Sequence, residues 1–152
     1  MGTTTFSGPV RSGTLKTGET NGPNLGYAVL EQETSITLIS SNGVSSTLYI
    51  PSGSKIVNIV VDVLTAFNSG TSAVLSVGTA AAGTQYASGV DVKTATGRIT
   101  PTFTAAQLAA MSNVSVLGVA APTTAPVVVT VTPTGATSAG YVRVTVIYAQ
   151  LA

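Results

Sequence analysis

The side chains that usually perform acid–base or nucleophilic chemistry are scarce in this chain. Histidine and cysteine are both absent from its 152 residues. The usual general base, the commonest metal ligand and thiolate chemistry are therefore missing. The acidic residues are five in number: Glu19, Glu31, Glu33, Asp62 and Asp91. Any catalytic or metal-binding site would have to be built from these carboxylates and from neutral polar groups.

Glu31 and Glu33 are spaced in a way that invites comparison with the acid pair of a glycosidase. Two residues apart on a strand, they would point the same way. A glycosidase, however, needs carboxyl groups that face each other across the substrate, about 5–9.5 Å apart, one of them with a raised pKa. We therefore interpret Glu31 and Glu33 as exposed residues near a strand end.

Two other features resemble ligand sites only in part. Residues 78–84, Gly-Thr-Ala-Ala-Ala-Gly-Thr, have the glycine spacing of a phosphate-binding loop, but they lack its lysine and nothing indicates a following helix. Asp62 and Asp91 would hold calcium only with help from carbonyl groups, so we interpret both as solvated or paired surface acids. The residues predict no catalytic, cofactor-binding or metal-binding site, and we expect a protein that is not an enzyme.

The composition is poor in charge and rich in apolar residues. Charged residues make up 7% of the chain and hydrophobic residues 44%, whereas an ordinary soluble domain has about 25% charged residues. A surface of Ser, Thr, Asn and Gln keeps a free monomer in solution only weakly, which favours a protein that works inside an assembly.

The charge distribution and the apolar runs argue against two classes of partner. The formal net charge is +1 and the six basic residues are scattered singly, so we expect no nucleic-acid binding. No apolar run approaches the roughly 18 residues of a membrane-spanning helix, so we expect no membrane partner. The start, MGTTTFSGPV, lacks the basic and apolar regions of a secretory signal peptide.

Residues 55–67 (KIVNIVVDVLTAF) are the strongest periodic segment. Apolar residues alternate from Val57 to Val63 and end with Phe67, and β-branched residues run throughout. This pattern predicts a long central strand with Val57, Ile59, Val61, Val63 and Phe67 on its core face. The opposite face carries Asn58 and Asp62, so we expect it to lie in a partly polar environment.

Alternation and turn residues predict the other elements. Asn42-Gly43 favours a type I′ turn, so we expect a hairpin of residues 34–41 and 44–50, with Ile36 and Leu38 on one face and Leu48 and Ile50 on one face. Thr104-Ala-Ala-Gln107 matches a capping box, with Phe103 and Leu108 at the staple positions, and predicts a helix over 105–111. Further strands are expected at 25–32, 72–77, about 90–92, 98–103, 114–119, 127–132 and 140–151. Together they predict an all-β fold, an antiparallel β-sandwich or a jelly roll, as one domain over residues 25–152.

Residues 1–24 precede this domain and contain five glycines and two prolines without periodicity. Such a composition predicts an extended N-terminal arm. The arm could pack on its own domain, or it could cross onto a neighbouring subunit or partner. For the second role, the candidate contact residues are Phe6, Pro9, Val10, Arg11, Leu15 and Lys16.

Six stretches carry a resemblance that extends over nearly the whole chain: FSGPVRSGT, GYAVLEQ, VSSTLYIPSGSKIVNIVVDV, LSVGT, TPTFTAAQLAA and GYVRVTVIYAQ. Their order resembles that of small β-rich structural proteins of tailed bacteriophages, particularly capsid decoration (cement) proteins. The resemblance implies a jelly roll or sandwich, often a homotrimer, on the outer surface of the virion capsid. It also implies contact with the major capsid protein, stabilisation of the shell, synthesis in the cytoplasm of the host bacterium, and no cofactor.

Two other functions stay open. Tail and fibre proteins of phages share similar Gly/Thr-rich β segments. A glycan-binding β-sandwich would need an aromatic platform, but tryptophan is absent and the five tyrosines (27, 49, 86, 141 and 148) are spread over different strands and loops. Of these, we expect Tyr49 and Tyr86 to be exposed, and those within strong strands to be half buried.

Overall fold

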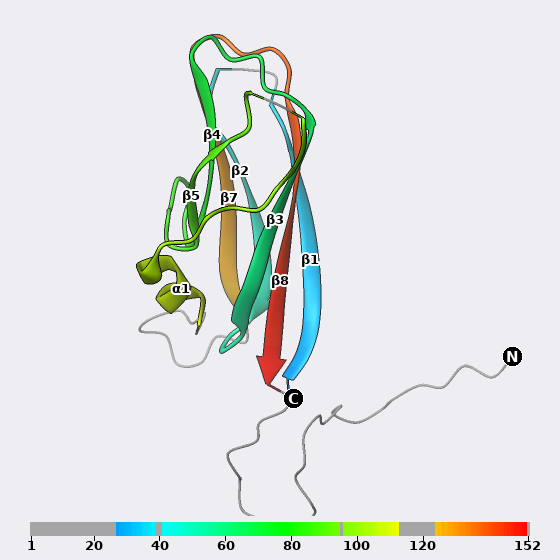
Figure 1. The fold of residues 1–152 in the computed structure, drawn as a ribbon, viewed down its shortest axis with the longest axis vertical. Coiled ribbons are helices and arrows are strands. Elements are labelled where there is room, and N and C mark those ends of the chain that lie inside the picture. The colour runs from blue at the N-terminus through cyan, green and yellow to red at the C-terminus, as the bar shows by residue number, and fades with distance from the viewer. Residues whose placement is uncertain (1–26, 39–40, 95, 113–123, 152) are drawn as a thin grey trace, which may run out of the picture.

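The computed structural model describes residues 27–38, 41–94, 96–112 and 124–151. This part of the chain forms eight strands and one helix (Figure 1). The elements in chain order are β1 (Tyr27–Thr37), β2 (Val44–Pro51), β3 (Lys55–Thr65), β4 (Ser72–Gly78), β5 (Ala87–Asp91), β6 (Gly97–Ile99), α1 (Ala105–Met111), β7 (Thr124–Thr134) and β8 (Tyr141–Leu151).

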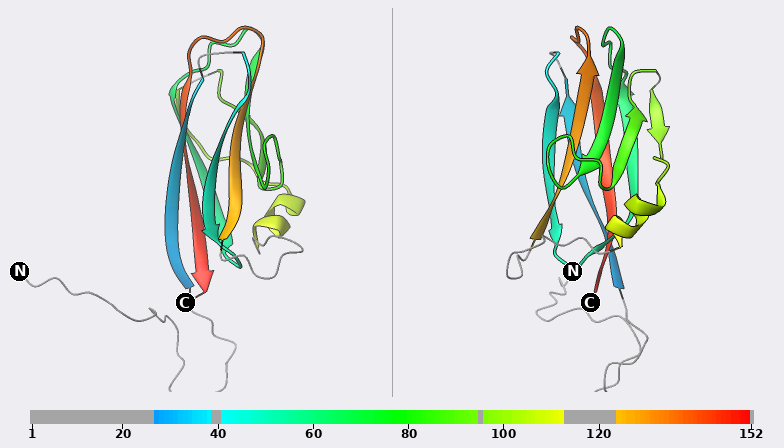
Figure 2. Two further views of the ribbon diagram at one scale, coloured as in Figure 1. Left: turned by 180° about the vertical axis from the view of Figure 1, so that it is seen from behind. Right: turned by 90° about the vertical axis from the view of Figure 1, so that its left-hand side faces the viewer.

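Two antiparallel four-stranded sheets face each other, as the views in Figure 2 show. Sheet A has the strand order β1-β8-β3-β6, and sheet B has the order β2-β7-β4-β5. Helix α1 lies at one end of the sandwich, close to β5 in both figures. The predictions of an all-β antiparallel sandwich and of a short helix over 105–111 are confirmed.

The core lies between the two sheets and is built from alternate residues of each strand. In β8 the inward residues are Val142, Val144 and Val146, and in β7 they are Val127, Val129 and Val131; all six are fully buried. Because side chains alternate across a strand, a two-residue period of valines puts every one of them inside. Each buried aliphatic side chain of this size contributes about 1.5–3 kcal/mol to folding.

Strands that follow one another in the sequence mostly lie in different sheets. Among the described strands, β4 and β5 are the one successive pair that lies in the same sheet. The predicted hairpin is therefore wrong: β1 pairs with β8, and β2 pairs with β7. Neither Asn42 nor Gly43 has the positive φ that a type I′ turn requires. The residues predicted to share a face nevertheless do so, and all four are buried in the core: Ile36, Leu38, Leu48 and Ile50.

Strand β3 contains an irregularity that the sequence pattern hides. Its register with β8 shifts between Ile56 and Asn58, and an extra residue of this kind re-aims a side chain. Ile56 points into the core, whereas Val57 is 50% exposed, so the prediction that Val57 lies on the core face is wrong. The other predicted core residues of the segment are buried: Ile59, Val61, Val63 and Phe67.

The remaining boundaries differ from the predictions in smaller ways. The segments expected as separate strands at 25–32 and 34–41 form one strand, β1. Strand β4 matches its prediction, and the extended segment expected at 98–103 is a strand only over Gly97–Ile99. The strand expected at 114–119 lies outside the described residues.

Candidate functional site

The residues predicted to contact a partner lie outside the part of the chain that the structure describes: Phe6, Pro9, Val10, Arg11, Leu15 and Lys16. The candidate site is therefore built from other side chains, which the sequence pattern did not single out.

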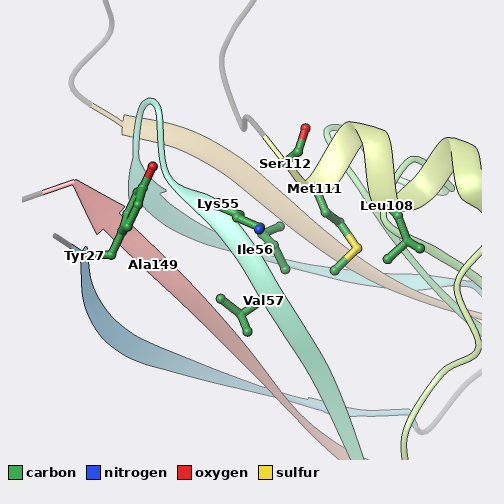
Figure 3. Close-up of a pocket in the computed structure, with 8 residues that line it drawn as sticks. All are labelled: Tyr27, Lys55, Ile56, Val57, Leu108, Met111, Ser112 and Ala149. Atoms are coloured by element: carbon green, nitrogen blue, oxygen red, sulfur yellow. The ribbon is translucent and has the colours of Figure 1, made fainter. Parts of the chain in front are cut away.

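A hollow of about 510 Å³ opens beside β3, at the end of the sandwich where β1 begins and α1 ends (Figure 3). Its walls come from β1, β3, β8 and α1 with its C-cap. We call it the apolar slot, and its lining residues are Tyr27, Lys55, Ile56, Val57, Leu108, Met111, Ser112 and Ala149.

Three large side chains of the apolar slot remain half exposed. The exposed fractions are 47% for Tyr27, 50% for Val57 and 53% for Leu108. Val29, two residues further along β1, is 64% exposed but does not line the apolar slot. Exposed apolar groups that gather in one place mark a binding surface more often than a chance feature.

Two local features turn these side chains outward. The shift of register in β3 places Val57 outside the core. Leu108 occupies the helix position that a hydrophobic staple would pack against Phe103. Instead Leu108 stays exposed, while Phe103 packs partly on the core.

Helix α1 is held firmly behind the apolar slot. Its capping box is formed as predicted: the Gln107 N–H donates to Thr104 Oγ1 at 3.3 Å, and the Thr104 N–H donates to Gln107 Oε1 at 2.9 Å. Gln107 Nε2 also donates to the Thr84 carbonyl and to Ser88 Oγ, each at 3.1 Å. Met111 is buried and belongs to the core. The wall that carries Leu108 is thus fixed to sheet B.

The free edge of β3 runs along the apolar slot. Strand β6 pairs with β3 only at Val61, Asp62 and Val63. Among the described residues, the segment 55–60 therefore has β8 on one side and no strand on the other. An edge of this kind presents unpaired backbone N–H and C=O groups.

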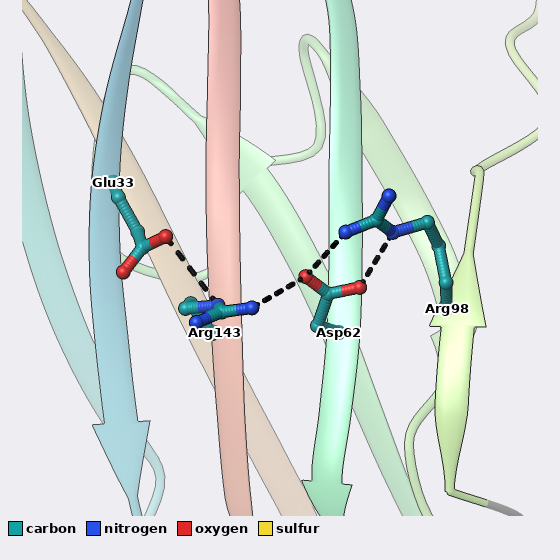
Figure 4. A network of polar contacts seen from close by, with 4 residues as sticks. All are labelled: Glu33, Asp62, Arg98 and Arg143. Carbon is teal, nitrogen blue, oxygen red and sulfur yellow. Dashed lines mark hydrogen bonds and ion pairs between the residues drawn. The ribbon is translucent and has the colours of Figure 1, made fainter.

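Four charged side chains cross the outer face of sheet A, one from each strand (Figure 4). Arg98 Nε donates to Asp62 Oδ1 at 2.8 Å, and its Nη2 donates to Oδ2 at 3.1 Å. Arg143 Nη2 donates to the same Oδ2 at 3.2 Å, and its Nε lies 3.3 Å from Glu33 Oε2. We call Glu33, Arg143, Asp62 and Arg98 the charged row.

The charged row holds Asp62 in its ionised form. The hydrogen bond from Arg98 is the largest cause that lowers the pKa of Asp62, from 3.8 to about 2; partial burial opposes it, and Arg143 lowers it further. A general acid needs a raised pKa, so Asp62 is unsuited to that role. Glu31 and Glu33 are exposed as predicted, although they lie in the middle of β1 and not near its end.

Asp91 stabilises its own turn. Its Oδ1 accepts hydrogen bonds from the N–H groups of Lys93 at 2.8 Å and Thr94 at 3.3 Å, and its Oδ2 accepts one from the Thr94 hydroxyl. That last bond is the largest cause of a lowered pKa of Asp91. Asp91 belongs to sheet B and Asp62 to sheet A, so the two do not share a site. Within the described ranges, no three acidic residues are grouped so as to hold a metal ion.

The glycine spacing of residues 78–84 has a packing explanation. A Cβ on Gly78 would lie 2.5 Å from the carbonyl carbon of Gly83, so the two glycines allow a close approach of backbone. The Ala82 N–H donates to Thr130 Oγ1 on β7 at 2.9 Å, which holds this loop against sheet B.

The tyrosines do not form a platform. Tyr86 is 3% exposed, so the prediction that it is exposed is wrong, and its burial raises its pKa. Tyr49 is 59% exposed on sheet B, whereas Tyr27 lies on sheet A. Of the tyrosines expected to be half buried, Tyr27 and Tyr141 are partly exposed and Tyr148 is buried.

Comparisons with family models, with curated proteins and with solved structures found no match for this chain. Within the described residues, no helix has the length and apolar character that crossing a bilayer requires.

Proposed function

We propose that the chain is a non-enzymatic virion protein that decorates the outer surface of a bacteriophage capsid and stabilises the closed shell by binding the major capsid protein. The observation that carries the proposal is the apolar slot, where Tyr27, Val57 and Leu108 are half exposed around one hollow. Such a surface favours a macromolecular partner. The charge-poor composition and the sequence resemblance favour a capsid as that partner.

The state of the described carboxylates supports a binding role over a catalytic one. Asp62 is held between two guanidinium groups, and Asp91 is used by its own turn. The charges of the charged row are already paired within the protein. These four side chains could therefore enter an interface without being left as unpaired buried charges, which is the costly situation.

We infer further that the fold is a jelly roll. Strand order β1-β8-β3-β6 faces strand order β2-β7-β4-β5, and six of the seven connections between successive strands cross from one sheet to the other. Eight strands in two such sheets are the pattern of jelly rolls, which occur in viral capsid proteins and also in lectins.

A decoration protein of this kind would act by mass action. A protein that binds only the closed shell stabilises it by about 2.7 kcal/mol per site when its free concentration is 100 times its Kd. A homo-oligomer would add avidity, on the order of 10²–10⁴, because its contacts form together. We propose a homotrimer on the strength of the resemblance, made in the cytoplasm of the host bacterium.

Co-sedimentation with capsid shells that lack the protein tests the proposal. We expect saturable binding of the full chain, and weaker binding of a chain that starts at Leu25 if the arm of residues 1–24 contributes contacts. If the full chain does not bind shells, the decoration role is wrong.

A tail or fibre component is the second candidate, because the apolar slot would serve an interface there equally well. Quantitative analysis of purified particles separates the two. We expect on the order of hundreds of copies per particle for a decoration protein, and a few dozen or fewer for a tail-tip or fibre protein. A glycan-binding role loses support because Tyr86 is buried; saturable sugar binding abolished by Tyr49→Ala would restore it.

A further inference from the structure

We propose that the apolar slot takes up an extended segment of a partner protein, which pairs as an added strand with the free edge of β3 at residues 55–60. The identity of the partner, a capsid protein, rests on the proposed function. The docking site itself rests on three observations among the described residues: a strand edge without a neighbouring strand, apolar walls and one lysine without an ion pair.

The first observation is the backbone edge of β3 at residues 55–60. Strand β6 pairs with β3 from Val63 to Val61 and ends at Ile99. The chain then leaves sheet A, runs through residues 100–104 without strand structure and enters α1. An added strand would continue the line of β6 alongside residues 55–60. Its affinity would come from main-chain hydrogen bonds, as in other cases of strand addition.

The side chains of the walls determine what kind of strand fits. Ile56 and Val57 lie on β3, and Leu108 and Met111 face them from α1 (Figure 3). A volume of about 510 Å³ is within the range of specific ligand pockets. Because the strand edge pairs with an extended backbone and the walls are apolar, the occupant is a polypeptide segment with aliphatic side chains at alternate positions.

Lys55 provides the third observation. It is the one charged residue among those that line the apolar slot. None of the ion pairs among the described residues includes it, whereas both arginines of the charged row are paired. Charge complementarity therefore places a carboxylate of the partner segment next to Lys55.

Matched substitutions test the site through binding. Val57 is half exposed inside the apolar slot and Val29 is more exposed outside it, so Val57→Asp and Val29→Asp both leave the core intact. We expect Val57→Asp to weaken shell binding roughly tenfold or more, because the new carboxylate would remove an apolar contact and would repel the partner carboxylate placed next to Lys55. Val29→Asp should change it less than about threefold. Lys55→Glu should weaken binding as well, and more so at low salt.

The absence of cysteine allows a direct test of the occupant. Ser112 lines the apolar slot, and Ser41 lies exposed in the connection between β1 and β2. Each single variant, Ser112→Cys and Ser41→Cys, is labelled with a benzophenone maleimide, mixed with shells and irradiated. We expect a cross-link from position 112, and none from position 41, to one apolar segment of the capsid protein that contains Asp or Glu.

The outcomes separate the docking site from the proposed function. If shells bind wild type and the Val57→Asp variant equally, or if position 112 cross-links only to the protein's own chain, the docking proposal is overturned and decoration stands. If shells do not bind at all, the labelled variant is offered to purified tails. A cross-link there supports the docking site and moves the function to the tail, and no cross-link in either assembly overturns the docking proposal.

Discussion

Gly140, just before β8, lies against the aromatic ring of Phe67, just after β3, so closely that a Cβ on Gly140 would overlap the ring. Phe67 is 1% exposed. The Gly140 carbonyl accepts a hydrogen bond from the Leu38 N–H at 3.0 Å, and Asn68 Oδ1 accepts one from the Ala139 N–H at 3.0 Å. These contacts close the end of the sandwich that lies away from the apolar slot.

We expect Gly140→Ala to lower the free energy of unfolding by about 1–3 kcal/mol, because the new methyl group must displace the Phe67 ring from a packed core. Gly70→Ala is the matched control: its Cβ would lie 3.7 Å from the nearest atom, the Gly135 Cα, which is ordinary contact. Urea unfolding measures both. Equal, small effects in the two variants would contradict the packing argument.

The charged row predicts a specific loss of stability in acid. The folded-state pKa of Asp62 is about 2, below its ordinary 3.8. Ionised Asp62 therefore contributes stability that is fully present above about pH 4 and is lost as the pH falls toward 2. Asp62→Asn should be less stable than wild type by a constant amount above pH 4, and the difference should shrink below it.

Urea midpoints of wild type and Asp62→Asn between pH 2 and pH 7 test this expectation. Asp91→Asn provides the comparison, because the pKa of Asp91 is also lowered, but by hydrogen bonds within its own turn and not by arginines. If the difference for Asp62→Asn did not change between pH 5 and pH 2, the arginine contacts would not act on its ionisation.

A hydroxyl pair joins the two sheets at the edge where β1 faces β2. Thr34 Oγ1 and Ser46 Oγ lie 2.6 Å apart. We expect a double-mutant cycle of Thr34→Val and Ser46→Ala to give a coupling energy of about 0.5–1.5 kcal/mol, the usual net value of such a hydrogen bond. Additive effects of the two single changes would show that the contact does not hold the sheets together.

Gln107 should contribute more to the stability of the protein than the Thr104 cap alone. Thr104→Ala removes one cap and should cost about 1 kcal/mol. Gln107→Ala also removes the bonds to Thr84 and Ser88 and opens a buried position, so about 2–3 kcal/mol is expected. Hydrogen exchange of the amides of residues 105–111 should become faster in Gln107→Ala than in Thr104→Ala. The reverse order would contradict the anchoring role.

Much of the fold follows from local pattern. The alternation in β3, β4, β7 and β8 identified these strands, and four of the five core-face residues predicted in residues 55–67 are buried, because burial on one face selects apolar residues at every second position. The capping box marked the helix for a similar reason, since its hydrogen bonds are local. Local chemistry was sufficient for these elements.

Other features depend on contacts between distant residues and could not be predicted in this way. Asn42-Gly43 marks a change of direction, but it does not say whether the next strand pairs alongside or crosses to the facing sheet. The outward turn of Val57 depends on its register with β8. The burial of Tyr86 depends on how the loop after β4 packs, where the Tyr86 N–H donates to the Val77 carbonyl at 2.9 Å. The apolar slot brings together residues of β1, β3, β8 and α1 that are far apart in the sequence, so it left no local signature.

The pairing of β1 with β8 has a consequence for synthesis of the chain. Among the described residues these are the first and the last strands in sequence order, and they are aligned over eleven residue pairs. During synthesis, β1 has no partner strand in its sheet until β8 has been made, and β2 has none until β7 has been made. Folding is therefore expected to be slow, because long loops must close before these strands can pair. Chains in which β1 and β2 have not yet paired with β8 and β7 would expose strand edges that invite aggregation or chaperone binding.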